Sequence, residues 1–162
     1  MKTLIIIRHA KAETTFTLND FERSLNDRGK TDAPVMAKRL HKKLKIDAFV
    51  SSPAKRAKKT AEFFADAYDV DEKDIIYVSA LYQAPSSVFF EVVSALDNRF
   101  NSVAIFAHNP GITNFANELF PEAKLDNMPT CSVFAVQADV DHWSAFGKAK
   151  RSFLLFDYPK NG

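Results

Sequence analysis

The stretch KTLIIIRHAKAE, residues Lys2–Glu13, decides the fold class of this chain. Its residues 4–7 form a continuous apolar run rich in β-branched side chains. Such a run is typical of a strand that is buried on both faces within a parallel sheet. Arg8 and His9 follow directly, so a guanidinium and an imidazole stand at the carboxyl end of this strand. Ligands of open α/β sheets bind at that end, so the stretch predicts a central strand and the position of a functional site.

Strand-like and helix-like segments alternate along the rest of the chain. We expect strands at 47–51, 75–78, 103–107, 132–136 and 152–156, and helices at about 34–44, from 53, at 85–96 and from 110. The alternation predicts an α/β protein, in which a mainly parallel sheet has helices on both faces. Because the last two strands are too close for a helical crossover, at least one of them should be antiparallel.

Capping signals define the beginnings of two helices. Asn26 is a predicted N-cap, but Pro34 lacks a donor and clashes with the preceding turn. We therefore expect a short first turn, a kink or break, and then the main helix from about Pro34 to Leu44. Ser52 followed by Pro53 predicts an N-cap hydroxyl with proline at the first helical position.

Composition limits the class of protein. The 162 residues, 46% of them hydrophobic, predict one globular domain over residues 1–162. The net charge of +2 gives no general reason to expect nucleic acid or a membrane surface as partner. Cys131 is the single cysteine, which fits a reducing cytoplasm, and no segment resembles a signal peptide or a membrane span. Four glycines argue against a Gly-rich phosphate loop.

Two further segments repeat the pattern of a strand followed by a cationic or imidazole side chain. His108 and Asn109 follow the strand expected at 103–107, and Arg56 lies in the first helical turn after the strand at 47–51. Parallel strands present these ends at one edge of the sheet, so two histidines and two arginines should converge there. The neighbouring lysines Lys55, Lys58 and Lys59 are interpreted as a solvated face. Asn109 is interpreted as orienting either His108 or a loop, and it is also a candidate substrate-binding residue.

This convergence predicts phosphoryl transfer. Arginine forks match phosphate oxygens, and surrounding cations keep an imidazole neutral by lowering its pKa. One neutral imidazole could then attack phosphorus and form a phosphohistidine intermediate, while the second passes a proton to the leaving group and stabilises equatorial oxygens. We expect no metal, because the arginines would repel a cation and no paired-histidine spacing is present. No other cofactor is implied.

Four motifs together resemble the histidine phosphatase superfamily, which has the phosphoglycerate mutase-like fold. They are the triplet RHA at residues 8–10, RSLNDRG at 23–29, SSPAKRAKKTA at 51–61 and AHNPG at 107–111. The resemblance implies a three-layer α/β/α sandwich, with His9 as the nucleophile and a phosphate pocket formed by Arg8, Arg23, Arg56 and His108. The short length and the wording of RHAKA and AHNPG resemble the SixA-type branch of small phosphohistidine phosphatases. That branch implies protein phosphohistidine as the substrate.

The chain departs from the family pattern at two places. Ala10 replaces the glycine of the triplet, which a backbone with negative φ would tolerate. The larger members carry a glutamate acid where this chain reads LYQAPSS, with Tyr82 either at the pocket rim or packed, and Glu91 is expected on the surface. A shortage of acids suits a good leaving group such as phosphohistidine better than an alkyl ester.

The remaining carboxylates and rival functions complete the set of hypotheses. Asp20 and Glu22 could act as acids or pair with Arg23, and pairing is the preferred interpretation. The rival enzyme is a phosphatase for a small phosphate ester, such as a sugar phosphate or a nucleotide. A non-catalytic phosphate-binding adaptor is the rival from another class. A nucleic-acid binder using KRLHKKLK and AKRAKK is disfavoured, since no aromatic residues are interleaved there.

Overall fold

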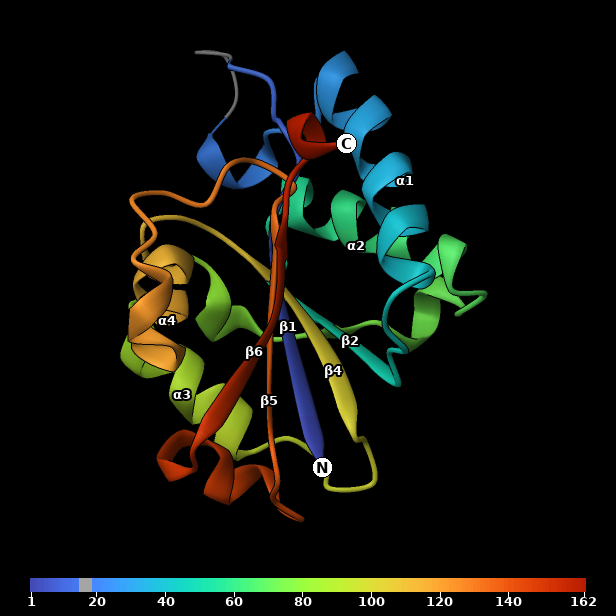
Figure 1. Ribbon diagram of the computed structural model, residues 1–162. Coiled ribbons are helices and arrows are strands. Elements are labelled where there is room, and N and C mark those ends of the chain that lie inside the picture. The colour runs from blue at the N-terminus through green and yellow to red at the C-terminus, as the bar shows by residue number, and fades with distance from the viewer. Residues whose placement is uncertain (15–18) are drawn as a thin grey trace.

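The computed structural model describes residues 1–14 and 19–162, which form one mixed sheet between two layers of helices (Figure 1). The strand order is β3-β2-β4-β1-β5-β6. The bounds are β1 Lys2–Arg8, β2 Ala48–Ser51, β3 Ile76–Tyr77, β4 Ser102–Ala107, β5 Val133–Ala138 and β6 Arg151–Asp157. The first four strands of this order are parallel, whereas β5 runs antiparallel to both β1 and β6. The predicted mainly parallel sheet with an antiparallel end is confirmed.

Helices cover both faces of the sheet, as the edge-on view in Figure 1 shows. On one face lie α1, Asp27–His41, and α2, Lys55–Ala67; on the other lie α3, Ser86–Ser94, and α4, Gly111–Leu119. Each face of the sheet has its own apolar core. The three-layer α/β/α sandwich is therefore confirmed. In the described part of the chain, no helix has the length and apolar character needed to span a membrane.

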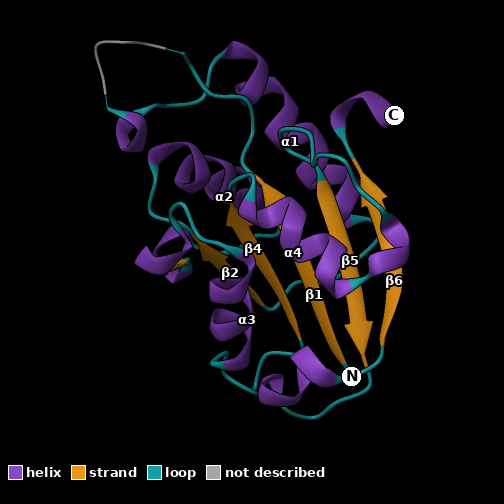
Figure 2. Ribbon diagram, turned by 90° about the vertical axis from the view of Figure 1, so that its left-hand side faces the viewer, coloured by secondary structure: helices purple, strands orange, loops and turns teal. Residues whose placement is uncertain are grey.

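The central strand β1 contributes to both cores. Leu4 and Ile6 pack in the core under α3 and α4, while Ile5 and Ile7 pack in the core under α1 and α2. All four side chains are fully buried. The alternation of side chains along a strand explains why a continuous apolar run is needed here. The strand runs upward to the edge of the sheet where Arg8 begins the polar segment (Figure 2).

Two predicted helix boundaries are wrong. α1 is one continuous helix from Asp27 and contains Pro34, with the Asn26 side chain accepting from Gly29 N–H at 2.9 Å. Proline removes one donor, that to the carbonyl of Lys30, and Lys30 is exposed to water that can replace it. The buried stripe on the opposite face holds the two halves together as one helix.

The second correction concerns Ser52. The helix α2 begins at Lys55 with Ala54 at the N-cap, so the Ser52 hydroxyl is not the N-cap and Pro53 is not the first helical residue. The Ser52 backbone N–H instead donates to Phe106 O at 3.0 Å, which extends the pairing of β2 with β4 by one residue. The Ser52 side chain is thereby placed at the edge of the sheet, where the functional residues gather.

Candidate active site

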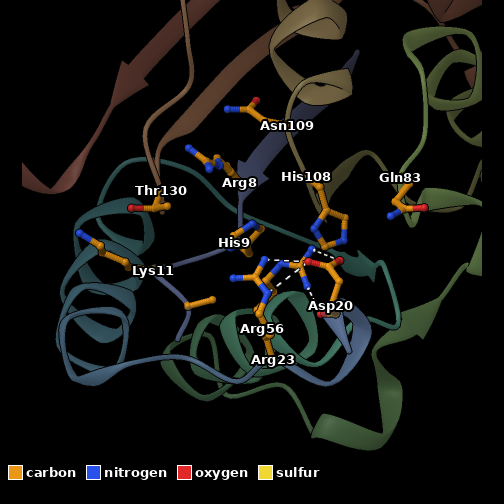
Figure 3. A pocket seen from close by; sticks show the side chains of 11 residues that line it. Arg8, His9, Lys11, Asp20, Arg23, Arg56, Gln83, His108, Asn109 and Thr130 are labelled. Carbon is orange, nitrogen blue, oxygen red and sulfur yellow. Dashed lines mark hydrogen bonds and ion pairs between the residues drawn. The ribbon is translucent and has the colours of Figure 1, made fainter. Parts of the chain in front are cut away.

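A cavity of about 370 Å³ lies at the carboxyl ends of β1, β2 and β4. The predicted residues converge there (Figure 3), since its lining comprises Arg8, His9, Lys11, Ala12, Asp20, Arg23, Arg56, Gln83, His108, Asn109 and Thr130. Among residues 1–14 and 19–162, no group of three potential His, Cys, Asp or Glu ligands could hold a metal ion. The two arginines and two histidines expected from the strand ends, Arg8, Arg56, His9 and His108, are all among the residues that line the cavity.

His9 is held in one tautomer. Its Nδ1 lies 2.7 Å from the carbonyl oxygen of Ala10, and because a carbonyl can only accept, Nδ1 carries the ring proton. The other nitrogen, Nε2, is left with a free lone pair. Burial is the main cause that lowers the pKa of His9 to about 3, and the positive charges of Arg56 and Arg8 lower it further. The ring is therefore neutral at physiological pH and competent as a nucleophile.

His108 faces His9 across the cavity, with the ring centroids 5.2 Å apart. Its Nε2 lies 2.7 Å from Ser52 Oγ, whereas its Nδ1 is buried without a hydrogen-bond partner in the described residues. Burial and then the charge of Arg56 lower the pKa of His108 to about 3. Two neutral imidazoles thus lie side by side among fixed positive charges.

The arginine donors are only partly used within the protein. Arg8 donates from Nη1 to Met128 O at 2.9 Å, and the buried Nε atoms of Arg8 and Arg56 have no partner in the described part of the chain. Burial and the neighbouring Arg56 charge lower the pKa of Arg8. Polar atoms are rarely buried without partners in native proteins, so spare arginine donors at one cavity indicate an anion site.

Asp20 already binds two of these arginines. Arg56 Nη2 donates to Asp20 Oδ2 at 2.9 Å, and Arg56 Nη1 donates to the Asp20 backbone carbonyl at 2.7 Å. Arg23 Nη2 donates to Oδ1 at 2.8 Å, and the Tyr82 hydroxyl donates to Oδ2 at 2.6 Å. The hydrogen bond from Tyr82 is the largest cause that holds the pKa of Asp20 well below its usual range, and the bonds from Arg23 and Arg56 lower the pKa further. An ionised carboxylate therefore stands where a phosphoryl group would meet Arg56 and Arg23.

The contacts of Asp20 and Tyr82 decide two alternatives that the sequence left open, the partner of Asp20 and the position of Tyr82. Asp20 pairs with Arg23, as preferred, and pairs with Arg56 as well. Tyr82 reaches the site through its hydroxyl, and its ring packs edge-on against His108 with centroids 5.6 Å apart. Glu91 is exposed on the surface, as expected. Ala10 is buried and its φ is not positive, so the missing glycine is tolerated.

Asn109 lines the cavity, but its amide group is fully engaged with neighbouring segments. Its Nδ2 donates to Asn127 Oδ1 at 2.7 Å and to Met128 O at 3.1 Å, and its Oδ1 accepts from Thr113 Oγ1 at 2.5 Å. Of the two roles considered for Asn109, its contacts are those of a residue that orients a loop. That loop also accepts the hydrogen bond from Arg8, so Asn109 acts on the site through it.

Two hydroxyl groups were missed as parts of the site. Thr60 accepts from Ala10 N–H at 2.9 Å and donates to Arg56 O at 2.8 Å, so it ties the segment after β1 to the helix that carries Arg56. Ser52 contacts His108, as described above. The sequence signal for Thr60 is its position one turn after Arg56, on the same side of α2. The sequence signal at Ser52, a serine followed by proline, predicts a helix N-cap and does not indicate the contact with His108.

Comparisons with known proteins bear on the fold and on part of the motifs. Residues 4–81 match the model of the histidine phosphatase superfamily (branch 1). A SixA structure from Agrobacterium tumefaciens has a TM-score of 0.82 at 23% identity, covering 98% of both chains. The protein histidine phosphatase SixA complexed with tungstate has a TM-score of 0.83 at 23% identity, again covering 98% of both chains.

A more distant likeness is to mycobacterial glucosyl-3-phosphoglycerate phosphatase, with a TM-score of 0.67 at 15% identity, covering 94% of this chain and 96% of that chain. No curated protein matches the chain in sequence. At these identities the solved structures bear on the fold, while the family model reports on the motifs themselves. The matched residues include the triplet with Arg8 and His9, and the segments with Arg23 and Arg56. Over residues 4–81, which hold these motifs, the chain is similar to the histidine phosphatase superfamily (branch 1).

Proposed function

We propose that this protein is a metal-independent phosphatase that hydrolyses protein phosphohistidine through a covalent intermediate on His9. The observation that carries the proposal is the 2.7 Å contact between His9 Nδ1 and Ala10 O, which leaves Nε2 as a free lone pair among arginines. The likeness of residues 4–81 to the histidine phosphatase superfamily and the spare arginine donors support a phosphoryl group as the ligand.

The reaction has two displacements at phosphorus. His9 Nε2 attacks the phosphorus of a substrate whose phosphorylated ring is already protonated on its other nitrogen. A P–N bond forms to His9, the P–N bond to the substrate breaks, and the substrate ring keeps its proton and leaves as neutral imidazole. Water then attacks phospho-His9, releases inorganic phosphate and restores the neutral imidazole. Arg8, Arg23 and Arg56 hold the phosphoryl oxygens, and His108 stabilises the charge that develops on them.

The shortage of acids at the cavity supports the proposed substrate class. Asp20 is the one carboxylate in its described lining, and its depressed pKa keeps it ionised. The site therefore offers no carboxylic acid to protonate a leaving group in the observed arrangement. A protonated imidazole leaves without such help, whereas an alkoxide does not. This supports phosphohistidine over an alkyl phosphate.

A second candidate is a phosphatase for a small phosphate ester. A cavity of about 420 Å³ adjoins the first and shares Lys11 and Thr130 with it. Its lining includes Arg28, Asp32 and Lys160, and the Arg28 charge is balanced by Asp32 at 3.0 Å. Lys11 and Lys160 could bind a further anionic group of a small substrate, so this adjoining cavity keeps the second candidate open.

Phosphate release tests the two candidates against each other. A phosphohistidine protein and an aryl phosphate are each incubated with the enzyme in EDTA, using wild type, His9→Ala and, as a matched control, His142→Ala. His142 is an exposed histidine outside the cavity. We expect wild type and the control to prefer phosphohistidine, and His9→Ala to lose activity on both substrates.

The other outcomes assign the protein differently. Turnover of small esters alone would keep the site and replace the substrate. Binding of tungstate that depends on Arg56, with no turnover of either substrate, would make the phosphate-binding adaptor the better description. Loss of wild-type activity in EDTA would contradict the metal-independent mechanism. Capture of an acid-labile phosphoryl group on wild type, and not on His9→Ala, would support the intermediate directly.

A further inference from the structure

Ser52 contacts His108 through a buried hydrogen bond to which the reaction above gives no role. Ser52 follows β2 and His108 follows β4, and the Ser52 N–H bond to Phe106 O fixes the two segments side by side. Ser52 is fully buried and His108 is 5% exposed. Their 2.7 Å contact between Oγ and Nε2 is therefore shielded from solvent and held by the sheet itself.

The direction of this hydrogen bond follows from the other contacts of the serine. Ser52 Oγ also accepts from Ala54 N–H at 3.3 Å. If His108 Nε2–H donated to Oγ, the serine hydroxyl proton would have no acceptor among the described residues. If the hydroxyl donates to Nε2, then the hydroxyl, Nε2 and the Ala54 N–H are all paired. The first arrangement leaves two buried groups unmet among the described residues, the hydroxyl proton and the Nδ1 lone pair, whereas the second leaves only Nδ1–H, so the second is favoured.

We propose that Ser52 is a positioning residue that donates to His108 Nε2 and thereby holds the neutral ring as the Nδ1–H tautomer. His108 Nδ1 is the ring nitrogen that is buried without a partner in the described structure. His108 lines the cavity beside His9 (Figure 3), so Nδ1–H is the donor left for an oxygen of the transferring phosphoryl group. This inference rests on the proposed function for the identity of its ligand, but the tautomer itself does not.

The role differs from that of a charged donor. His108 is neutral because burial and Arg56 lower its pKa, so it donates a hydrogen bond without first taking a proton from solution. Loss of the Ser52 hydroxyl would leave Nε2 without a donor and allow the proton to move from Nδ1 to Nε2. The ring would then present a lone pair to phosphoryl oxygens, which repel it.

Nitrogen-15 NMR of protein labelled at its histidines measures directly which ring nitrogen of His108 carries the proton. We expect a protonated Nδ1 and an unprotonated Nε2 for His108 in the wild type and in Ser51→Ala. Ser51 is the matched control, because it is a fully buried neighbour whose hydroxyl donates to Ser52 O and not to His108. In Ser52→Ala the proton should lie on Nε2 or exchange between both nitrogens. A wild-type His108 protonated on Nε2 would overturn the proposal.

Tungstate titration and kinetics extend the test to the ligand. Tungstate should shift the Nδ1 resonance of wild-type His108 when it binds. Ser52→Ala should lower kcat about 10- to 100-fold with KM changed little, because one donor to the transition state is disturbed. Ser52→Thr, which restores the hydroxyl, should recover much of kcat if circular dichroism shows it folded. Equal kcat for wild type and Ser52→Ala would contradict the role.

The NMR result separates this inference from the proposed function. If the wild type hydrolyses neither substrate, but His108 is the Nδ1–H tautomer in the wild type and not in Ser52→Ala, the positioning role stands and the proposed activity is wrong. If the wild type is active but His108 has the same tautomer in the wild type and in Ser52→Ala, the proposed activity stands and the positioning role is wrong.

Discussion

The strand β1 carries a cation near each end, and the two are satisfied very differently. Lys2, at the amino end, is 2% exposed, and its Nζ donates to Asn98 O, Phe100 O and Asn101 Oδ1 at 2.6 to 2.9 Å. Arg8, at the carboxyl end, gives one hydrogen bond to Met128 O and leaves a buried Nε unpaired among the described residues. All three donors of Lys2 are used, so it fixes a loop, whereas Arg8 keeps donors for a ligand.

The surroundings strengthen this contrast. Lys2 Nζ lies over the ring of Trp143, 5.6 Å from its centroid, and both side chains are buried. Arg8 lies close enough to Arg56 for the second charge to lower its pKa. Cations that gather without enough acceptors destabilise the free protein and favour a bound anion. One strand therefore shows how a structural cation and a ligand-binding cation can be told apart.

The largest effect is expected from Arg8→Met. Loss of a phosphoryl-binding donor should lower kcat/KM for an aryl phosphate about 1,000-fold. The free energy of unfolding should stay within about 1 kcal/mol of wild type, because few internal bonds are lost. Steady-state kinetics and urea unfolding measure the two quantities. A variant that is destabilised by several kcal/mol yet remains active would reverse the assignment of the two ends.

Acid sensitivity is the next largest effect at this end of the sheet. His9 and His108 have pKa values of about 3 when folded, against an ordinary 6.5, so the unfolded chain binds more protons between these values. Stability is therefore full above pH 7 and falls as the pH drops below 6.5. From pH 7 to 5 the loss should be about 2 kcal/mol for each histidine. Urea unfolding of His108→Gln should show about half of the wild-type loss.

At the amino end, Lys2→Met should change stability and spare the chemistry. Asn98 O and Asn101 Oδ1 lose their buried donor, while Phe100 O keeps the Trp143 indole at 2.8 Å. The expected cost is about 2 kcal/mol of unfolding free energy, since each of the two lost hydrogen bonds contributes about 1 kcal/mol net and Asn98 and Asn101 are exposed to water. Below its melting temperature the variant should keep wild-type kcat. A selective loss of kcat with unchanged stability would contradict the structural role.

The sequence predicts what depends on local pattern. The apolar run at 4–7 identifies the central strand, and the side chains that follow three parallel strands predict their meeting point. Arg8, His9, Arg56 and His108 could therefore be brought together before any coordinates were known. In each case the backbone period and the chain direction of a parallel strand determine where the side chain lies.

The sequence does not predict which of several possible hydrogen-bond or packing partners a side chain contacts in the folded protein. A serine before proline usually caps a helix, but Ser52 lies next to His108, and no local pattern records that neighbour. Pro34 removes one hydrogen bond, and the packing of the buried helix face outweighs that loss. Asp20 meets Arg56 across 36 positions of the chain, so its choice of arginine is a tertiary fact. These outcomes require the assembled sheet.

Asp20→Asn gives the smallest effect and the sharpest test of the carboxyl end. An anion that reaches Arg56 and Arg23 must displace the Asp20 carboxylate, so removing its charge should tighten tungstate binding about tenfold. Asp47→Asn is the matched control at the amino end, where Asp47 Oδ2 accepts from Asn101 N–H and Ser102 N–H, and it should leave the affinity unchanged. Calorimetry at fixed ionic strength measures both. Weaker tungstate binding in Asp20→Asn would show instead that the carboxylate holds Arg23 and Arg56 in position for their ligand. The affinity lost with that positioning would then exceed the affinity gained by removing the negative charge.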